Sequence, residues 1–332
     1  MNRKAYGAVF AVFLLFIAEL FLHSDTFLFK YRSVFAAGRL MDKLEALTEL
    51  PIDIVLIGNS RTDNGFDSLL LKEMTGLGVF NLGVPGANEE ILYGIVSKLD
   101  SKGVFSQGKV SKVLLGLDES IFQQGDSLGY GVFVANQNEL IHRYQFKELF
   151  DTYFRLLGYG GQLKELREPE KLIRFFKATY QEIEPMGGSA KINYGFRPGE
   201  RGKFQNDQQL LVQEAGAQNP PDQQVESYFW QLIKLLKEKN IEVAVFFPPL
   251  LNRDVLFLDT DNKNAGPYIR IKDKLLSMGI PILDIAYQET KVASDFANAG
   301  HLNREGATRF SKIMGQELLA LWPNIGGKQD DF

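Results

Sequence analysis

The chain has 332 residues, of which 45% are hydrophobic and 23% are charged, so it can bury a full-sized core. Its 37 Lys and Arg against 41 Asp and Glu give a formal net charge of −4, which leaves no basic excess for a phosphate backbone, and we expect no nucleic acid partner. Cys is absent, which excludes disulfides, thiolate zinc sites and a cysteine nucleophile. Because the three His leave few places for a metal site, we predict neither a metal nor another cofactor.

The first segment predicts a membrane anchor. After Arg3 and Lys4, an apolar run of about 18 residues extends from Ala5 to Leu22, and its only charged residue is Glu19. A run of this length can form a thin membrane span. A secretory signal peptide begins in the same way, but the nearest small-residue cleavage step lies beyond Arg32. We therefore expect an uncleaved single-pass anchor, with a cleaved signal peptide and a buried N-terminal helix as the alternatives. The basic start predicts that the rest of the chain is periplasmic or extracellular.

The anchor (1–22) and a connector (23–50) are followed by apolar runs that alternate with amphipathic stretches, the pattern of a parallel sheet covered by helices. Strands are predicted at 52–57, 79–82, 112–117, 242–247 and 280–284, and helices at 66–74, 89–99, 225–239, 269–278 and 303–319. These elements predict a three-layer α/β/α domain with a five-stranded parallel sheet. It is formed by residues 51–119 and 225–322, with a tail at 323–332.

The interval 120–224 does not follow this rhythm, and we interpret it as a long insertion after the third strand that is a possible substrate-binding region. Helical patches at 139–157 and 169–180 precede a Gly-, Pro-, Asn- and Gln-rich stretch at 186–221. Its aromatic side chains either line a groove for sugar rings or form local core. They are Tyr130, Tyr144, Tyr153, Phe154, Tyr159, Tyr194 and Phe196.

Chemistry is expected where the parallel strands end, because loops converge there and helix N-termini supply unpaired amide donors. The first strand ends in Gly58-Asn59-Ser60-Arg61, which displays Ser60 at the start of a helix. There a backbone N–H can face a developing oxyanion. Taken alone, a turn of this kind is ordinarily only a helix cap.

The second and third predicted strands end in turns of the same kind. Gly83 and Gly86 flank a sharp turn that can bring a backbone N–H close to Ser60, or that only leads into a helix capped by Asn88. The third strand ends in an acidic turn at Asp118, which is either functional or a cap.

One His lies at a loop-to-helix junction in the sheet domain. His301 directly precedes a helix capped by Asn303, whereas His23 lies at the end of the anchor and His142 lies in the insertion. A serine hydroxyl is a poor nucleophile until a base accepts its proton, and His has a suitable pKa. The sequence thus pairs Ser60 with His301.

These blocks, in this order, resemble the SGNH (GDSL-like) hydrolase superfamily. They are Gly58-Asn59-Ser60 after the first strand, Asn81 to Gly86 after the second, and His301-Leu302-Asn303 near the C-terminus. The Gly-Asn-Ser-Arg form, the anchor and the long insertion are closer to the membrane-anchored branch of that superfamily. This branch includes the alginate and cellulose O-acetylation proteins and the D-alanyl transfer protein of teichoic acid modification. The resemblance covers residues 50–120 and 225–320.

The resemblance implies a flavodoxin-like SGNH fold with Ser60 as the nucleophile and His301 as the base. It also implies oxyanion donors from the backbone of Ser60 and of Gly86 or Gly83. The further candidates for oxyanion or substrate contacts are Asn88, Arg61 and Asp118.

Two positions depart from the family pattern. The Asp that usually precedes the catalytic His by three residues is replaced by Asn298, and Asp295 is the alternative orienting residue. Asp118 stands nearest to the position of the family's third-block Asn. An Asn carbonyl can hold the His Nδ1–H, but it stabilises the imidazolium less than a carboxylate does.

The resemblance and the anchor together predict an extracytoplasmic acyltransferase that O-acetylates a polysaccharide through an acyl-Ser60 intermediate. They imply a membrane-bound O-acyltransferase as its partner. The alternatives are a carbohydrate esterase and a non-catalytic polysaccharide-binding or scaffold subunit.

Overall fold

The computed structural model describes residues 3–24, 27, 30, 31, 34–105, 108–123, 129–181, 183, 188–199, 227–251, 254–283, 285, 286 and 291–323. The chain forms two compact units. The N-terminal unit comprises Met1–Asp42 and Asp126–Met186, and the sheet unit comprises Lys43–Gly125 and Gly187–Phe332. Of the Gly- and Gln-rich stretch at 186–221, only residues 188–199 lie within the described residues.

The sheet unit contains one five-stranded parallel sheet, which confirms the predicted α/β class. Its strands are β1 (Ile54–Gly58), β2 (Val79–Gly83), β3 (Lys112–Gly116), β4 (Glu242–Phe246) and β5 (Ile282–Leu283). The order β2-β1-β3-β4-β5 is that of the flavodoxin-like doubly wound fold. Gly58 pairs with Gly83, so the ends of β1 and β2 lie side by side.

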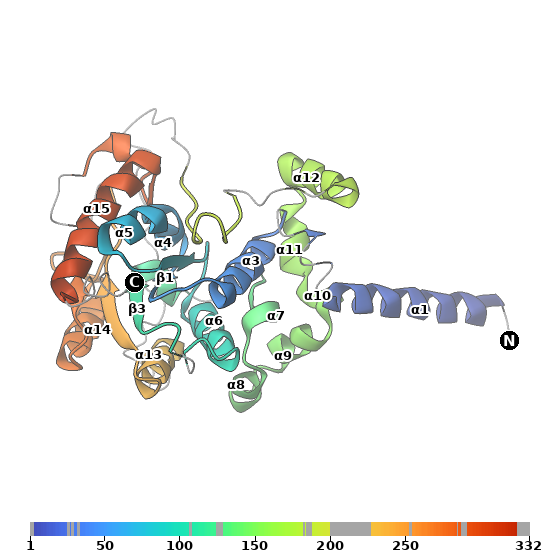
Figure 1. Ribbon diagram of the computed structural model, residues 1–332. Coiled ribbons are helices and arrows are strands. Elements are labelled where there is room, and N and C mark those ends of the chain that lie inside the picture. Colours follow the sequence, from blue (N-terminus) through green and yellow to red (C-terminus); the bar gives the residue numbers. More distant parts are fainter. Residues whose placement is uncertain are drawn as a thin grey trace. The chain divides into compact units, whose positions relative to one another are not determined.

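Helices cover both faces of this sheet. The elements are α4 (Ser60–Gly65), α5 (Ser68–Thr75), α6 (Glu89–Ser101), η1 (Glu119–Phe122), α13 (Tyr228–Glu238), α14 (Gly266–Ser277), η4 (Ala293–Asp295), the hairpin β6 (Phe296–Asn298) and β7 (His301–Leu302), and α15 (Arg304–Leu321). Figure 1 shows α5 and α15 on one side of the sheet and α6 and α13 on the other. The strands are mostly apolar because both of their faces are buried, apart from Asn81 in β2 and the first residues of β3 and β4.

The core between the sheet and α15 holds the carboxyl edge of the sheet in place. Leu56, Leu114 and Phe246 meet Phe310 and Met314 of α15 in one buried cluster. Each such side chain contributes about 1.5–3 kcal/mol by leaving water. The loops that follow β1, β3 and β4 are therefore carried by a rigid base.

The N-terminal unit is helical in its described part. It holds α1 (Arg3–His23), the first half of α3 (Ala36–Glu49), α7 (Gly131–Val134), α8 (Gln137–His142), α9 (Phe146–Tyr153), α10 (Arg155–Gly158), α11 (Gly160–Glu165) and α12 (Pro169–Tyr180). Residues 36–49, assigned to a connector, are thus helical. The helical patch predicted at 139–157 is three short helices, because Tyr144 adopts a left-handed φ of 59° and Phe154 leaves helical geometry.

Aromatic packing forms the core of the N-terminal unit. Phe27 packs edge-on against Tyr159, and Tyr31 stacks on Phe175 with ring centroids 4.6 Å apart. Tyr130 and Tyr159 are buried, so these two predicted groove aromatics are core residues, as is Phe196 in the sheet unit. Tyr144, Tyr153 and Phe154 are exposed.

The helix α1 is long and apolar enough to span a membrane or to serve as a signal sequence. Its window Tyr6–His23 has a mean hydropathy of 2.0, and its apolar side chains face outward along its length. At its end, the Glu19 carboxylate accepts hydrogen bonds from the backbone N–H groups of Arg155 (2.5 Å) and Leu156 (3.0 Å). Glu19 thus caps the start of α10 from within the apolar helix.

Candidate active site

The loops after β1 and before α15 bring Ser60 and His301 together. Ser60 is the first residue of α4, and the side chain of the preceding Asn59 accepts a hydrogen bond from the Arg61 N–H and caps that helix. His301 begins β7 in the hairpin that leads into α15. The Ser60 Oγ lies 2.7 Å from the His301 Nε2, which is hydrogen-bonding distance for transfer of the serine proton.

The second nitrogen of His301 is held by Asn298. The His301 Nδ1 lies 2.9 Å from the Asn298 Oδ1, and the Gly300 N–H donates to the same oxygen at 3.1 Å. An atom that accepts from a backbone N–H must be the amide oxygen, so Nδ1 carries the proton and Nε2 faces Ser60 with its lone pair. This is the tautomer that a general base requires.

Asp295, the alternative orienting residue, has another partner. Its carboxylate pairs with the Arg309 guanidinium, and its backbone carbonyl accepts the Asn303 N–H at 2.8 Å. The described contacts of His301 place Asn298, and not Asp295, on its Nδ1.

Asp118 braces the nucleophile from both sides. Its buried carboxylate accepts from the Asn59 Nδ2 (2.7 Å) and pairs with the Arg61 guanidinium (2.9 Å), so it is bound to the residues before and after Ser60. The Ser120 backbone N–H and hydroxyl donate to it as well. Burial alone would raise the pKa of Asp118, but the Arg61 charge and these hydrogen bonds outweigh it and lower the pKa, so Asp118 is an anion.

The electrostatics keep His301 neutral. Burial lowers the pKa of His301 below its usual value of 6.5, and the Arg61 and Arg197 charges also lower it. The Asp118 and Asp63 carboxylates act in the opposite direction but do not reverse the shift. The Arg61 guanidinium lies against the His301 loop, since a Cβ added at Gly300 would stand 3.5 Å from the Arg61 Nε. A neutral imidazole is the form that accepts the Ser60 proton.

The two glycines proposed as oxyanion donors differ in their availability. The Gly83 N–H donates to the Asn81 Oδ1 at 2.9 Å and is therefore occupied. Gly86 follows in the turn after β2 with a left-handed φ of 72°, which favours glycine. Asn88 caps α6 by accepting from the Ile91 N–H and donates to the Gln123 carbonyl, so it serves the local fold.

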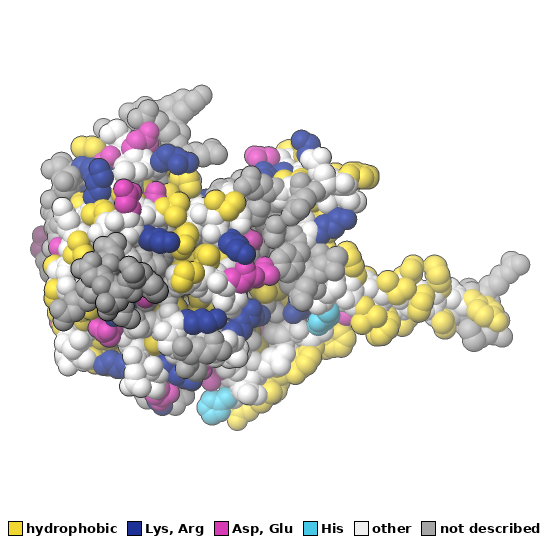
Figure 2. All heavy atoms as spheres, in the orientation of Figure 1, with side chains coloured by type: hydrophobic (Ala, Val, Ile, Leu, Met, Phe, Trp, Pro, Cys, Tyr) yellow, Lys and Arg dark blue, Asp and Glu magenta, His cyan; other side chains and the backbone are white. Residues whose placement is uncertain are grey.

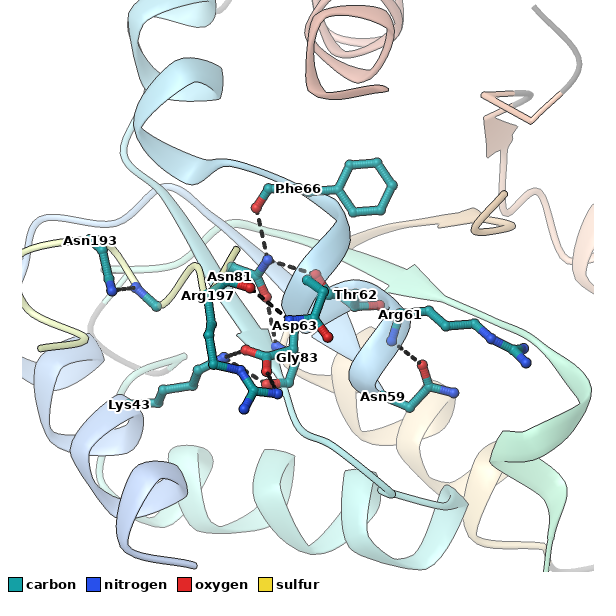
Figure 3. Close-up of polar contacts among 12 residues, drawn as sticks. Lys43, Asn59, Arg61, Thr62, Asp63, Phe66, Asn81, Gly83, Asn193 and Arg197 are labelled. Atoms are coloured by element: carbon teal, nitrogen blue, oxygen red, sulfur yellow. Dashed lines mark hydrogen bonds and ion pairs between the residues drawn. The ribbon is translucent and has the colours of Figure 1, made fainter. Parts of the chain in front are cut away.

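A buried charge cluster, not anticipated from the sequence, lies behind the nucleophile (Figure 3). The Lys43 Nζ donates to the Asp63 carboxylate (2.6 Å) and to the Gly83 carbonyl (2.7 Å), and Arg197 pairs with the same carboxylate (2.8 Å). The Asp63 and Lys43 side chains are 0% and 1% exposed. The cluster ties α3, α4 and the end of β2 into one unit.

Small residues let α4 approach the sheet closely. A Cβ at Gly83 would stand 2.2 Å from the Asp63 N, and a Cβ at Gly58 would stand 2.1 Å from the Thr62 Oγ1. Asn81 fixes the same helix by donating to the Thr62 and Phe66 carbonyls. Gly58 and Gly83 are thus required by packing against α4.

A short segment from the insertion lies against β2, α4 and β7. The Asn81 N–H donates to the Tyr194 carbonyl (2.9 Å), and the Arg197 N–H donates to the Asp63 carbonyl (3.2 Å). A Cβ at Gly199 would stand 2.3 Å from the Leu302 carbonyl. We call residues 193–199 the strap, since it runs from β2 past α4 to the strand that carries His301.

Within the described residues, no group of three or more His, Asp or Glu side chains is arranged to hold a metal ion.

Comparisons with known proteins show a distant structural similarity. No family model matches the chain, and no curated protein matches its sequence. Among solved structures, the chain is similar to a lipolytic protein of the G-D-S-L family from Desulfitobacterium hafniense DCB-2. The identity is 8% and the TM-score 0.38, over 80% of this chain and 99% of that chain. A similarity at this level carries no argument, so the function rests on the site itself.

Proposed function

We propose that the protein is an SGNH-like serine acyltransferase that O-acetylates a polysaccharide outside the cytoplasm. The observation that carries the proposal is the relay from the Ser60 Oγ through His301 to the Asn298 Oδ1, with distances of 2.7 and 2.9 Å. The SGNH resemblance of the sequence blocks agrees with this relay.

The reaction has two half-reactions that share one intermediate. Ser60 Oγ attacks the carbonyl carbon of an acetyl donor, and its proton passes to the His301 Nε2. The tetrahedral oxyanion is expected to lie near the Ser60 and Gly86 amides, and its collapse expels the donor alkoxide, which takes the proton from His301. A sugar hydroxyl then attacks the acetyl-Ser60 while His301 takes its proton. Collapse breaks the bond between the acetyl carbon and the Ser60 Oγ, releases the O-acetyl sugar and returns the proton from His301 to Ser60.

Charged side chains around His301 tune the base. Arg61 and Arg197 lower the pKa of His301 while Asp118 and Asp63 raise it, so each cation acts beside its own counter-charge. Because Asp118 and Asp63 hold these guanidinium groups in place, this arrangement of charges is fixed before substrate binds.

An anchor favours transfer over hydrolysis. A tethered enzyme can receive acetyl groups from a membrane-bound O-acyltransferase partner, whereas an esterase gains little from a tether. A transferase must also hold the acceptor sugar and keep water from the acyl-enzyme. The strap contacts α4 and the strand that carries His301, and we assign acceptor binding to it.

Covalent labelling of Ser60 tests the proposal. The full chain in detergent is treated with a fluorophosphonate, and the adduct is mapped by mass spectrometry, with Ser60→Ala and His301→Gln as controls. We expect an adduct at Ser60 that is lost in the first variant and slowed in the second. A folded protein without an adduct would contradict the catalytic proposal and favour the scaffold subunit.

Partition of an acetyl donor distinguishes transfer from hydrolysis. With an activated acetyl ester and an oligosaccharide at saturation, a transferase acetylates the sugar faster than it hydrolyses the ester. Hydrolysis that dominates under these conditions would favour the carbohydrate esterase.

A further inference from the structure

The N-terminal unit exposes more large apolar side chains than a water-facing surface normally does. Beyond α1, they lie on the helices that surround its end. We call six of them the collar: Phe146, Phe150, Phe154, Leu157, Ile173 and Phe176, of which Leu157 is 61% and Phe176 58% exposed.

The helix α12 has the pattern of an interfacial helix. Phe175 and Ala178 face the interior of the unit, and Phe175 stacks on Tyr31. Ile173 and Phe176 form a second apolar face that is directed outward. Lys177 borders this face, whereas Lys171 lies on the opposite side of the helix and pairs with Glu165 and Glu168. An amphipathic helix with an exposed apolar face is typical of helices that lie in the headgroup region of a bilayer.

The helix α9 also has an exposed apolar face opposite a buried one. Phe146 and Phe150 are one helical turn apart and both are exposed, while Thr152 is buried on the opposite side. Phe154 and Leu157 continue the apolar surface into α10, which packs against α1.

Contacts between α1 and the helices of the collar determine where the collar lies along the axis of α1. Glu19 caps α10, and the His23 Nε2 lies 3.1 Å from the Tyr153 carbonyl. Glu19 precedes the end of α1 by four residues, which is about 6 Å along a helix. Interfacial helices bury their apolar faces about 5–10 Å into the headgroup and acyl boundary. If α1 spans the bilayer, α10 therefore begins at that depth.

Within the N-terminal unit, α9 and α10 to α12 surround the base of α1 (Figure 1). Figure 2 shows apolar side chains along all of α1 and further ones on the helices at its base. We propose that the collar lies on the lipid surface, with its six side chains inserted at the headgroup–acyl boundary around α1. The occupant of this surface is lipid, because the collar continues the apolar surface of α1, against which α10 packs.

Single-cysteine labelling tests the collar directly. The chain contains no Cys, so each introduced thiol is the only one. Full-length Phe150→Cys, Ile173→Cys and Phe176→Cys are spin-labelled and reconstituted in vesicles of phosphatidylcholine, with and without phosphatidylglycerol. Collision with oxygen and with a water-soluble nickel chelate reports the depth of each label. Leu14→Cys in α1 marks the bilayer, and Leu276→Cys on α14, 51% exposed in the sheet unit, marks water.

We expect the collar labels to favour oxygen over the chelate, at a depth between those of the two reference labels. Chelate accessibility equal to that of Leu276→Cys, with Leu14→Cys in lipid, would overturn the collar and leave the anchor standing. If Leu14→Cys is also accessible to the chelate, the lipid-bound collar and the membrane anchor are both wrong. Collar labels that neither reagent reaches would show that protein, and not lipid, covers this surface. Three separate collar sites keep the result independent of any one variant that fails to fold.

Discussion

At the residue scale, the relay differs from a Ser-His-Asp triad in one atom. Asn298 accepts the His301 Nδ1–H at 2.9 Å and fixes the tautomer, but its amide carries no charge to stabilise the imidazolium. Asn298 is also exposed, so water competes for its oxygen. The geometry of the base is thus complete while its electrostatic support is weak.

Asn298→Asp is expected to raise kcat for an acetyl ester roughly 10-fold, because a carboxylate at this position stabilises the protonated His301. Asn298→Ala should lower kcat by at least a similar factor. Asp295→Asn is the matched control: it loses the Arg309 pair, so the melting temperature falls while kcat is retained. A kcat that responds to Asp295 and not to Asn298 would reverse the assignment.

The pH dependence follows from the lowered pKa of His301. Since the base must be neutral, kcat/KM rises with pH through that pKa, and the acid limb should have its midpoint below 6.5. The folded state disfavours the imidazolium, so His301 also withdraws stability as the pH falls below about 6.5. Arg61→Gln removes a positive neighbour, which favours the imidazolium and should move the midpoint to higher pH. A midpoint that stays or falls would show that Arg61 does not act on His301.

The buried Lys43–Asp63–Arg197 cluster predicts a large cost for losing its carboxylate. Asp63→Asn leaves two cations without an anion and should cost about 3–5 kcal/mol in the free energy of unfolding. Lys43→Met should cost less, because Arg197 still pairs with Asp63. Urea unfolding measures both. The control Lys191→Met breaks an exposed pair with Glu49 and should cost under about 1 kcal/mol. Equal costs for Asp63→Asn and Lys191→Met would contradict the role of the cluster.

At the element scale, the sequence predicts what depends on local pattern. The helix at 169–180 has the predicted bounds, and the five strands lie within two residues of theirs, because strands buried on both faces form continuous apolar runs. The break at Tyr144 was not predictable, since it depends on a left-handed φ in an otherwise amphipathic stretch.

Some of the polar contacts in the site can likewise be predicted from the sequence, and others cannot. The three-residue spacing of Asn298 and His301 can be read from the chain. The pairing of Asp63 with Lys43 and Arg197 joins positions far apart in sequence, and a single Lys on a helix carries no sign of its partner. Tertiary packing, and not local pattern, decides such contacts.

Gly199 in the strap is a position where an added methyl group is expected to reduce catalysis without touching Ser60 or His301. Gly199→Ala would place a Cβ 2.3 Å from the Leu302 carbonyl, next to His301 in β7, so the backbone must shift. We expect kcat to fall at least 10-fold, in line with the sensitivity of catalysis to small displacements. Gly266→Ala is the control, because its Cβ meets only the Arg270 side chain at 3.7 Å. Unchanged rates of Ser60 labelling in Gly199→Ala would show that the strap does not position the base.

At the scale of the whole molecule, the N-terminal segment is part of a folded unit. Phe27, Tyr31, Val34 and Phe35 are buried in the N-terminal unit, and Glu19 caps α10. A signal peptide that is removed after export does not pack against the mature protein in this way. Cleavage at the small-residue step near Ala36 would remove these aromatic side chains and expose the surfaces of Tyr159 and Phe175 that they cover.

We therefore predict that the chain retains its N-terminal helix, and its intact mass is the test. Protein purified from the membranes of expressing cells should retain residues 1–22 and should resist extraction by alkaline carbonate, which releases peripheral proteins. Phe27→Ala should lower the stability of the N-terminal unit by about 3–5 kcal/mol, the usual cost of a buried Phe, while Ser60 labelling is retained because the site lies in the sheet unit. Phe13→Ala is the matched control: it removes the same side chain from the outward surface of α1 and should leave that stability unchanged. A soluble product that begins after residue 22 and still unfolds like the full chain would show that α1 is a signal sequence and that its contacts with α10 are dispensable.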